Sequence, residues 1–231
     1  MKYLFLIVFL YGQYAHLHAI KKPYVIVLDP GHGGIYTGTV GKIPGAIEKD
    51  LVLAVAKRLK NRLQKKGYDV YLTRESDTAL DRINLISDLS KRALFSDEKK
   101  AELFVSLHVN GCSNKNMQGF ELYVPYEAKY PLRSYRLASA LHYDLSHKIK
   151  PDFSSGTLGN LNILDKGIRA SRFNVLMKVN SPAVLVELGY LSHVPSARQL
   201  CDSGYQELLA DALYCGIRRY MIHEYGVNVC V

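Results

Sequence analysis

Residues 24–34 read YVIVLDPGHGG and join a buried strand to a glycine-rich loop. The first five residues form a continuous apolar run, which is typical of a strand covered on both faces of a parallel sheet. Pro30 and the glycines after it end the strand and allow unusual backbone angles. The segment therefore predicts a parallel sheet whose first strand delivers His32 to a loop at its carboxyl edge.

Helix-like and strand-like stretches alternate along the rest of the chain. The helix expected at residues 47–66 carries apolar residues on one face and is followed by Gly67 as a C-cap. This alternation predicts an α/β fold: a single-domain sandwich with a twisted, mostly parallel central sheet flanked by helices on both faces. We expect further strands at residues 68–73, 103–107, 119–124 and 183–186, and further helices at residues 78–100, 132–148 and 205–221.

The composition limits the class of protein and its partners. A chain of 231 residues with 48% hydrophobic content is long and apolar enough for one domain with a core. Its net charge of +9 favours acidic partners such as nucleic acid, anionic lipid headgroups or an anionic polymer. Most basic residues lie on expected helix faces, and no nucleic-acid-binding motif accompanies them. We therefore expect a solvated basic surface and no nucleic-acid partner.

Residues 1–19 have the pattern of an export signal. A charged start is followed by an apolar run at residues 3–11 and by the small residue Ala19. The run is shorter than the roughly 20 residues that span a bilayer. We expect a mature domain at residues 20–231, located in the periplasm or secreted, with no stable membrane insertion after cleavage. Leu17 is larger than a cleavage site prefers, so a retained N-terminal anchor stays as the alternative.

The four cysteines do not form a metal-binding pattern. Cys112, Cys201, Cys215 and Cys230 include no close pair of the zinc-ribbon kind. In an exported protein Cys201 could pair with Cys215, and unpaired buried thiols are equally compatible with the sequence.

Four separate segments each bring one metal-type or acid/base residue to the expected sheet edge. They carry His32, Glu48, His108 and Glu187. Two histidines and one carboxylate match the ligand set of a catalytic zinc, although the set also suits iron or cobalt. Glu187 then stays free as a general base and later a general acid. It lies within an apolar strand, where a carboxylate is costly unless it is paired or functional.

Each of these residues also has a structural alternative. A histidine beside a glycine loop is often a surface or capping residue. Glu48 could complement the dipole of its helix, because it lies at the expected start of that helix. Ser106 and Asn110 flank His108 and could orient its ring, or they could make unrelated structural hydrogen bonds.

Four sequence blocks together resemble a known family. VIVLDPGHGG, IEKDLVLAVAKRL, LFVSLHVNG and NSPAVLVELGYLS are similar to the signature blocks of the zinc-dependent N-acetylmuramoyl-L-alanine amidases of bacterial cell walls. The likeness runs from about residue 24 to residue 220. It implies that His32, Glu48 and His108 bind Zn²⁺ and that Glu187 is the catalytic glutamate. The implied reaction is hydrolysis of the amide between the lactyl group of N-acetylmuramic acid and the L-alanine of the stem peptide of peptidoglycan.

The resemblance also raises questions of role and regulation. Some relatives in cell division insert a self-inhibiting helix before the last blocks. Only one helix, at residues 132–148, is expected here between Val124 and Asp165, so we expect no such element, and a protein activator stays open as a partner. We expect a monomer that acts in cell-wall remodelling or daughter-cell separation. The alternatives are a zinc peptidase acting on the stem peptide and a non-catalytic wall-binding module. A Ser-x-x-Lys pattern at Ser96 to Lys99 has no expected role.

Overall fold

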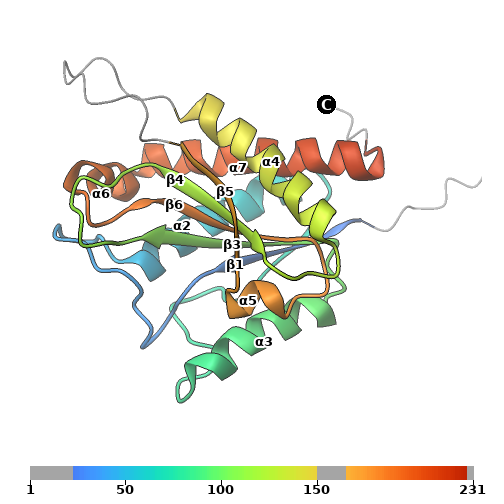
Figure 1. Cartoon of the computed structure of the whole chain (residues 1–231), viewed down its shortest axis with the longest axis horizontal. Helices are drawn as coiled ribbons and strands as arrows, with labels where there is room; N and C mark the ends of the chain where they lie inside the picture. Colours follow the sequence, from blue (N-terminus) through green and yellow to red (C-terminus); the bar gives the residue numbers. More distant parts are fainter. Residues whose placement is uncertain (1–22, 150–164, 228–231) are drawn as a thin grey trace, which may run out of the picture.

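Six strands form one sheet in the part of the chain that the computed structural model describes, residues 23–149 and 165–227 (Figure 1). The sheet has the strand order β2-β1-β3-β6-β4-β5. Neighbouring strands are parallel except for β4 and β6, which are antiparallel. The predicted mostly parallel sheet is therefore confirmed. The strands are β1 (Val25–Pro30), β2 (Asp69–Leu72), β3 (Leu103–Asn110), β4 (Phe120–Pro125), β5 (Asp165–Ser171) and β6 (Ala183–Tyr190).

Helices cover both faces of the sheet, as expected (Figure 1). One layer contains the long helices α2, α4 and α7 with the short α6, and the other contains α3 and α5. Each of the long helices has a buried apolar side, which explains why it packs against the sheet. The bounds are α2 (Glu48–Gln64), α3 (Leu85–Glu98), α4 (Pro131–Lys148), α5 (Asn174–Met177), α6 (Val194–Cys201) and α7 (Ser203–Tyr225).

Alternation along the strands assigns side chains to the two layers. In β1, Ile26 and Leu28 pack in the core beneath α2 and α7, whereas Val27 packs in the smaller core beneath α3 and α5. All six residues of β1 are buried, as the apolar run predicts. Leu107 and Val109 point into the larger core, so His108 between them faces the α3 and α5 side.

The observed elements differ from the predicted ones at particular places. The helix expected at residues 78–100 begins only at Leu85, so residues 78–84 are a loop. The reason is local: Asn84 caps the helix by accepting from the Ser87 amide at 3.0 Å, and Asp81 accepts from the amides of residues 83 and 84. The strand β5 and the short helices α5 and α6 were not predicted, because none of them has a clear apolar period.

Other predictions concern the chain ends and the cysteines. No helix within residues 23–149 and 165–227 combines the length and the apolar character that a bilayer span needs. The expected signal at residues 1–19 lies outside the described residues, as does Cys230. Cys112, Cys201 and Cys215 are free, so the pairing of Cys201 with Cys215 is not formed.

Candidate metal centre

The loop after β1 holds His32 in an unusual backbone conformation. His32 has a φ of 62°, in the left-handed region that residues with a β-carbon rarely adopt. The loop passes close to β3: a β-carbon added to Gly31 would lie only 2.3 Å from Cε1 of His108. Glycine at this position lets the two histidines approach, and their ring centroids are 4.9 Å apart. The glycine-rich segment thus allows a close contact between the first and third strands.

Glu48 is the first residue of α2 and joins the two histidines. Its Oε1 atom lies 3.0 Å from Nε2 of His32 and 2.9 Å from Nδ1 of His108. The same oxygen accepts from the Val109 amide at 3.1 Å, and Oε2 accepts from the Thr39 amide at 2.7 Å. These partners lie on β3 and on the loop before α2. Glu48 therefore connects the loop between β1 and α2 with strand β3. These contacts go beyond an interaction with the dipole of its own helix.

The surroundings of Glu48 keep it ionised. Burial raises the pKa of this carboxyl, but hydrogen bonds and charge interactions with His108 and His32 outweigh burial, and the net pKa lies well below the ordinary glutamate value. One donor atom from each of the three residues lies within 4.8 Å of the others. Two imidazole nitrogens and a carboxylate oxygen in this arrangement could hold a metal ion. The structure thus brings together the three residues that the sequence singled out.

Glu187 faces the same side of the sheet as His108. The two residues are Cα partners on the parallel strands β3 and β6, and partners in a parallel pair share a face. The register of this pair shifts between His108 and Asn110, so an irregularity lies next to the candidate centre. Glu187 lies inside β6 and His108 inside β3, whereas the sequence placed them at the strand ends.

Glu187 is half-buried, and one oxygen of its carboxyl is enclosed. Its Oε2 atom is buried and makes no hydrogen bond with any residue that the structure describes. Burial raises the pKa of Glu187, and the charges of Glu48 and Glu121 raise it further, to well above the ordinary glutamate value. A proton-exchanging group with a raised pKa beside a metal-type cluster is a strong candidate for acid/base chemistry.

A second buried carboxyl was missed by the sequence reasoning. Glu121 on β4 is the Cα partner of Glu187 on β6 and is buried. The hydroxyls of Tyr123 and Tyr190 donate to its two oxygens, and Nη1 of Arg169 lies 3.9 Å away. Burial and the bond to Glu121 raise the pKa of Tyr123 to about 12. The signal was present, because Glu121 lies within an apolar strand just as Glu187 does.

The other sequence candidates lie outside this cluster. Ser106 donates to Asp29 Oδ2 at 2.7 Å, and Asn110 Oδ1 accepts from the Gly111 amide at 2.8 Å, so these bonds are directed away from the His108 ring. Ser96 is buried on α3, and Lys99 Nζ lies 4.6 Å from the centroid of the Tyr71 ring. These contacts give the Ser-x-x-Lys pattern no catalytic arrangement.

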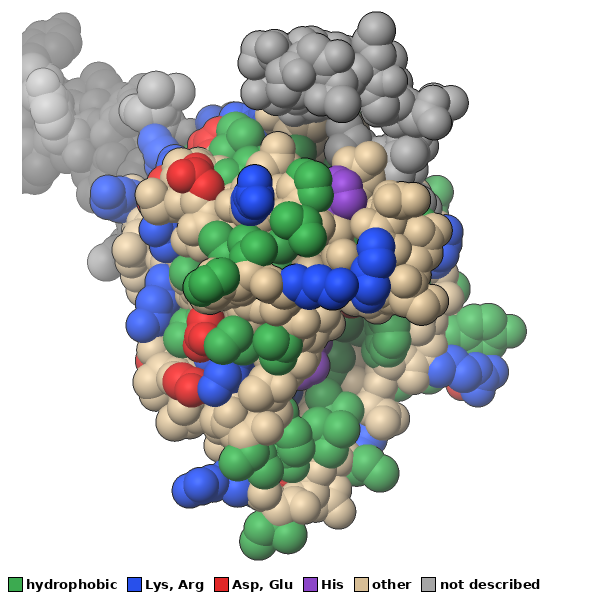
Figure 2. Space-filling view, turned by 90° about the vertical axis from the view of Figure 1, so that its left-hand side faces the viewer, with side chains coloured by type: hydrophobic (Ala, Val, Ile, Leu, Met, Phe, Trp, Pro, Cys, Tyr) green, Lys and Arg blue, Asp and Glu red, His purple; other side chains and the backbone are tan. Residues whose placement is uncertain are grey.

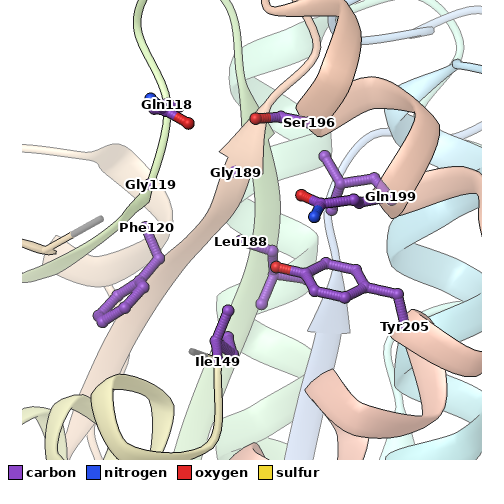
Figure 3. A pocket seen from close by; sticks show the side chains of 10 residues that line it. Gln118, Gly119, Phe120, Ile149, Leu188, Gly189, Ser196, Gln199 and Tyr205 are labelled. Carbon is purple, nitrogen blue, oxygen red and sulfur yellow. The ribbon is translucent and has the colours of Figure 1, made fainter. Parts of the chain in front are cut away.

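Two cavities differ in their relation to the centre. A cleft of about 440 Å³ is lined by Thr39, Lys42, Gly111 and Lys115, and Thr39 is the residue whose amide binds Glu48. Figure 2 shows a hollow in the face viewed, with a histidine side chain at its edge and lysine and arginine side chains above it. A smaller cavity of about 30 Å³ lies between Leu188 and Tyr205 (Figure 3). Leu188 belongs to the larger core, so this cavity is on the opposite face from Glu187 and has room for about one water.

Comparisons with known proteins agree with this architecture. The family profile described as N-acetylmuramoyl-L-alanine amidase (Amidase_3) matches residues 26–219. The chain is 32% identical over 207 residues to a germination-specific N-acetylmuramoyl-L-alanine amidase of Bacillus subtilis. The aligned region covers 87% of this chain and 81% of the relative.

Solved structures give the same assignment. The crystal structure of an N-acetylmuramoyl-L-alanine amidase from Clostridium difficile 630 superposes with a TM-score of 0.76 at 29% identity, over 88% of this chain and 99% of that chain. The CwlD amidase from Clostridioides difficile, solved in complex with the GerS lipoprotein, superposes with a TM-score of 0.74 at 28% identity, over 87% of this chain and 100% of that chain. Because both sequence and fold agree over most of its length, the chain belongs to the N-acetylmuramoyl-L-alanine amidase family of cell-wall peptidoglycan hydrolases.

Proposed function

We propose that this protein hydrolyses the amide between the lactyl group of N-acetylmuramic acid and the L-alanine of the stem peptide, with zinc bound by His32, Glu48 and His108. Glu187 acts as the general acid/base. The observation that carries the proposal is the convergence of three donor atoms within 4.8 Å, with the half-buried Glu187 as the Cα partner of His108 on the neighbouring strand.

The three donors fit zinc. Bond lengths of about 2.0–2.1 Å in a tetrahedral site place ligand atoms roughly 3.3 Å apart. The two histidine nitrogens lie 3.0 and 2.9 Å from Oε1 of Glu48, so small shifts of the side chains would admit the ion. Zinc held in this way supplies Lewis-acid chemistry, because it acidifies water and polarises a carbonyl oxygen. Iron or cobalt would suit the same set, and metal analysis of the purified protein distinguishes them.

Glu187 supplies the proton transfers. Its raised pKa brings the carboxyl closer to neutral pH, where it exchanges a proton most effectively. In the ionised form, the carboxylate takes a proton from the attacking water. The carboxyl then returns this proton to the nitrogen of the departing L-alanine, which leaves as a free amine. Oε2 makes no hydrogen bond with the described residues that would hold the carboxyl in its ionised form.

The wider setting follows from the family and from the sequence. A wall substrate requires export, so residues 1–19 act as the signal, the mature domain is residues 20–231, and the protein works in the periplasm or outside the cell in wall remodelling or daughter-cell separation. The net charge of +9 supports contact with an anionic wall polymer. One relative was solved with a lipoprotein, which supports a protein partner here as well. N-terminal sequencing of protein recovered from cells should begin near Ile20.

Product analysis tests the reaction. Purified peptidoglycan is incubated with the zinc-loaded mature protein, with and without chelator, and the products are identified by mass spectrometry. We expect peptides with a free L-alanine amino terminus and glycan strands with intact lactyl groups, only when metal is present. Products cut within the stem peptide would replace the proposed reaction with that of a peptidase.

A further inference from the structure

We propose that Arg74 and Arg92 are positioning residues that hold the His32 loop and the first turn of α2 in the metal-binding geometry. Both guanidinium groups are buried behind the loop, and both bind main-chain carbonyls next to the metal ligands. The inference rests on the proposed metal-binding role of His32, Glu48 and His108. It adds two residues outside the proposed ligand set.

Arg92 of α3 fixes the main chain at His32. Its Nη2 atom donates to the His32 carbonyl at 2.6 Å. Its Nη1 atom donates to the Pro30 carbonyl at 3.0 Å and to Asp29 Oδ1 at 2.9 Å. Its Nε atom donates to Asp88 Oδ2 at 2.6 Å, which anchors the guanidinium to its own helix. Every nitrogen of this side chain is therefore engaged, and two of them hold the loop.

These bonds meet the loop where its backbone is strained. A φ of 62° at His32 is unfavourable for a residue with a β-carbon, and such conformations persist when the surroundings fix them. The bond from Arg92 to the His32 carbonyl fixes the peptide plane that follows this residue. It therefore fixes the direction in which the imidazole leaves the main chain.

Arg74, just after β2, joins the two loops that carry metal ligands. Its Nη2 atom donates to the Gly31 carbonyl at 2.9 Å and to the Lys49 carbonyl at 2.7 Å. Its Nε atom donates to the Pro30 carbonyl at 2.9 Å. Gly31 precedes His32, and Lys49 follows Glu48. One guanidinium thus sets the distance between the main chains of two ligands that are far apart in the sequence.

Arginine suits this task better than lysine. Its guanidinium presents five donors in a rigid planar fork, whereas an ammonium is a point donor on a flexible stem. Burial and the nearby charge of Arg92 lower the pKa of Arg74 to about 10, which still leaves it protonated at neutral pH. Charge at the site is balanced by Asp29, which accepts from Arg92, Thr73 and Ser106.

The buried network supplies matched controls. Ser106→Ala and Thr73→Val each remove one hydrogen bond to Asp29, while they leave the carbonyls of residues 30, 31, 32 and 49 bound to the arginines. Arg74→Lys and Arg92→Lys keep the charge but break the fork that holds those carbonyls. If only the two arginine variants lose zinc affinity, the arginines position the ligands. If the Ser106 and Thr73 variants lose as much zinc affinity, the loss reflects a general weakening of the network.

The test measures zinc affinity without substrate. Each variant is titrated against a chromophoric chelator, its cobalt-loaded form is compared by visible absorption, and its stability is measured by urea unfolding. Because partners that orient metal ligands typically contribute about 10–100-fold in affinity, we expect losses in this range for Arg74→Lys and Arg92→Lys. We expect a weaker, altered cobalt spectrum for both, and near wild-type affinity for Ser106→Ala and Thr73→Val.

A milder variant covers the case in which an arginine variant does not fold. Asp88→Asn keeps Oδ1, which accepts from the amides of Leu80 and Asp81, but replaces the oxygen that binds Arg92 Nε with an amide donor. We expect it to fold and to bind zinc several-fold more weakly than the wild type.

Two outcomes would overturn the positioning role: folded arginine variants with wild-type zinc affinity, or controls that lose as much affinity as the arginine variants. A wild-type protein that binds zinc but does not release L-alanine-terminated peptides would instead refute the proposed reaction and leave the affinity comparison valid.

Discussion

Glu121 on β4 and Glu187 on β6 are directly opposite each other, so a buried and a half-buried carboxyl group share one face of the sheet. Their surroundings differ. Glu121 accepts from the hydroxyls of Tyr123 and Tyr190, whereas Oε2 of Glu187 has no hydrogen-bond partner among the described residues. Burial and the neighbouring charges of Glu48 and Glu121 raise the pKa of Glu187 well above its ordinary value, so Glu187 is the candidate for proton exchange.

The first prediction concerns the pH dependence of the reaction. Glu121→Gln removes a negative charge that raises the pKa of Glu187, so that pKa should fall. Because the general base must be ionised, the acid limb of the kcat/KM profile should move to lower pH. Glu127→Gln changes an exposed glutamate beyond the end of β4 and serves as the control, with an unchanged profile. An unshifted acid limb in Glu121→Gln would remove Glu121 from the control of this titration.

The second prediction concerns stability of the metal-free protein. The pKa of Glu187 is higher in the folded protein than the ordinary value, so the folded state binds more protons. Its stability contribution is present at low pH and is lost as pH rises through the folded-state pKa. Glutamine does not ionise. The free energy of unfolding of Glu187→Gln, measured in urea, should therefore increase relative to that of the wild type as pH rises. The increase should begin at about pH 4.3, the ordinary glutamate pKa, and continue to mildly alkaline pH. A constant difference across this range would contradict the assignment.

The third prediction separates the acid/base role of Glu187 from a ligand role. Glu187→Gln should keep wild-type zinc content, because the three proposed ligands are untouched. Its rate should fall by about 10²–10⁴-fold, the usual contribution of a general acid/base. Zinc content and product release are measured on the same sample, with Glu127→Gln as the control. Loss of zinc in Glu187→Gln would move this residue into the metal's ligand set.

The fourth prediction concerns regulation. Between Val124 and Asp165 the described residues contain one long helix, α4, and its buried residues Leu137, Leu141 and Leu145 belong to the core. That helix is therefore committed to covering the sheet and cannot serve as a lid. Mature protein, residues 20–231, should hydrolyse purified peptidoglycan with zinc and without an activator, as measured by dye release. A folded, zinc-loaded protein that becomes active only with a partner would show that another element blocks the site.

Much of the centre could be predicted because parallel sheets collect strand ends at one edge. That rule brings His32 and His108 together from distant segments and puts Glu187 beside His108, and Glu48 follows from the start of the amphipathic helix α2. The strand lengths were less predictable. His108 and Glu187 lie inside their strands, since β3 and β6 continue past the apolar runs through polar or glycine residues.

The supporting contacts could not be predicted from the sequence. Arg74 and Arg92 bind carbonyl oxygens, and a carbonyl is present at every residue, so no motif marks the acceptors. Glu121 carried the same signal as Glu187, but its pairing depends on β4 lying antiparallel to β6. The edge strand β5 was missed because it has no apolar period, and its position depends on pairing with β4.

The most direct test of the central claim is an anomalous difference map at the zinc absorption edge, from crystals of the zinc-loaded protein. We expect one strong peak within bonding distance of His32, Glu48 and His108, at about one zinc per chain, with Glu187 outside that distance. The matching map of His108→Ala should lack the peak, whereas that of His223→Ala, an exposed histidine on α7, should retain it. A peak bound through Glu187, or a zinc-loaded protein with its peak elsewhere, would show that His32, Glu48 and His108 are not the zinc ligands.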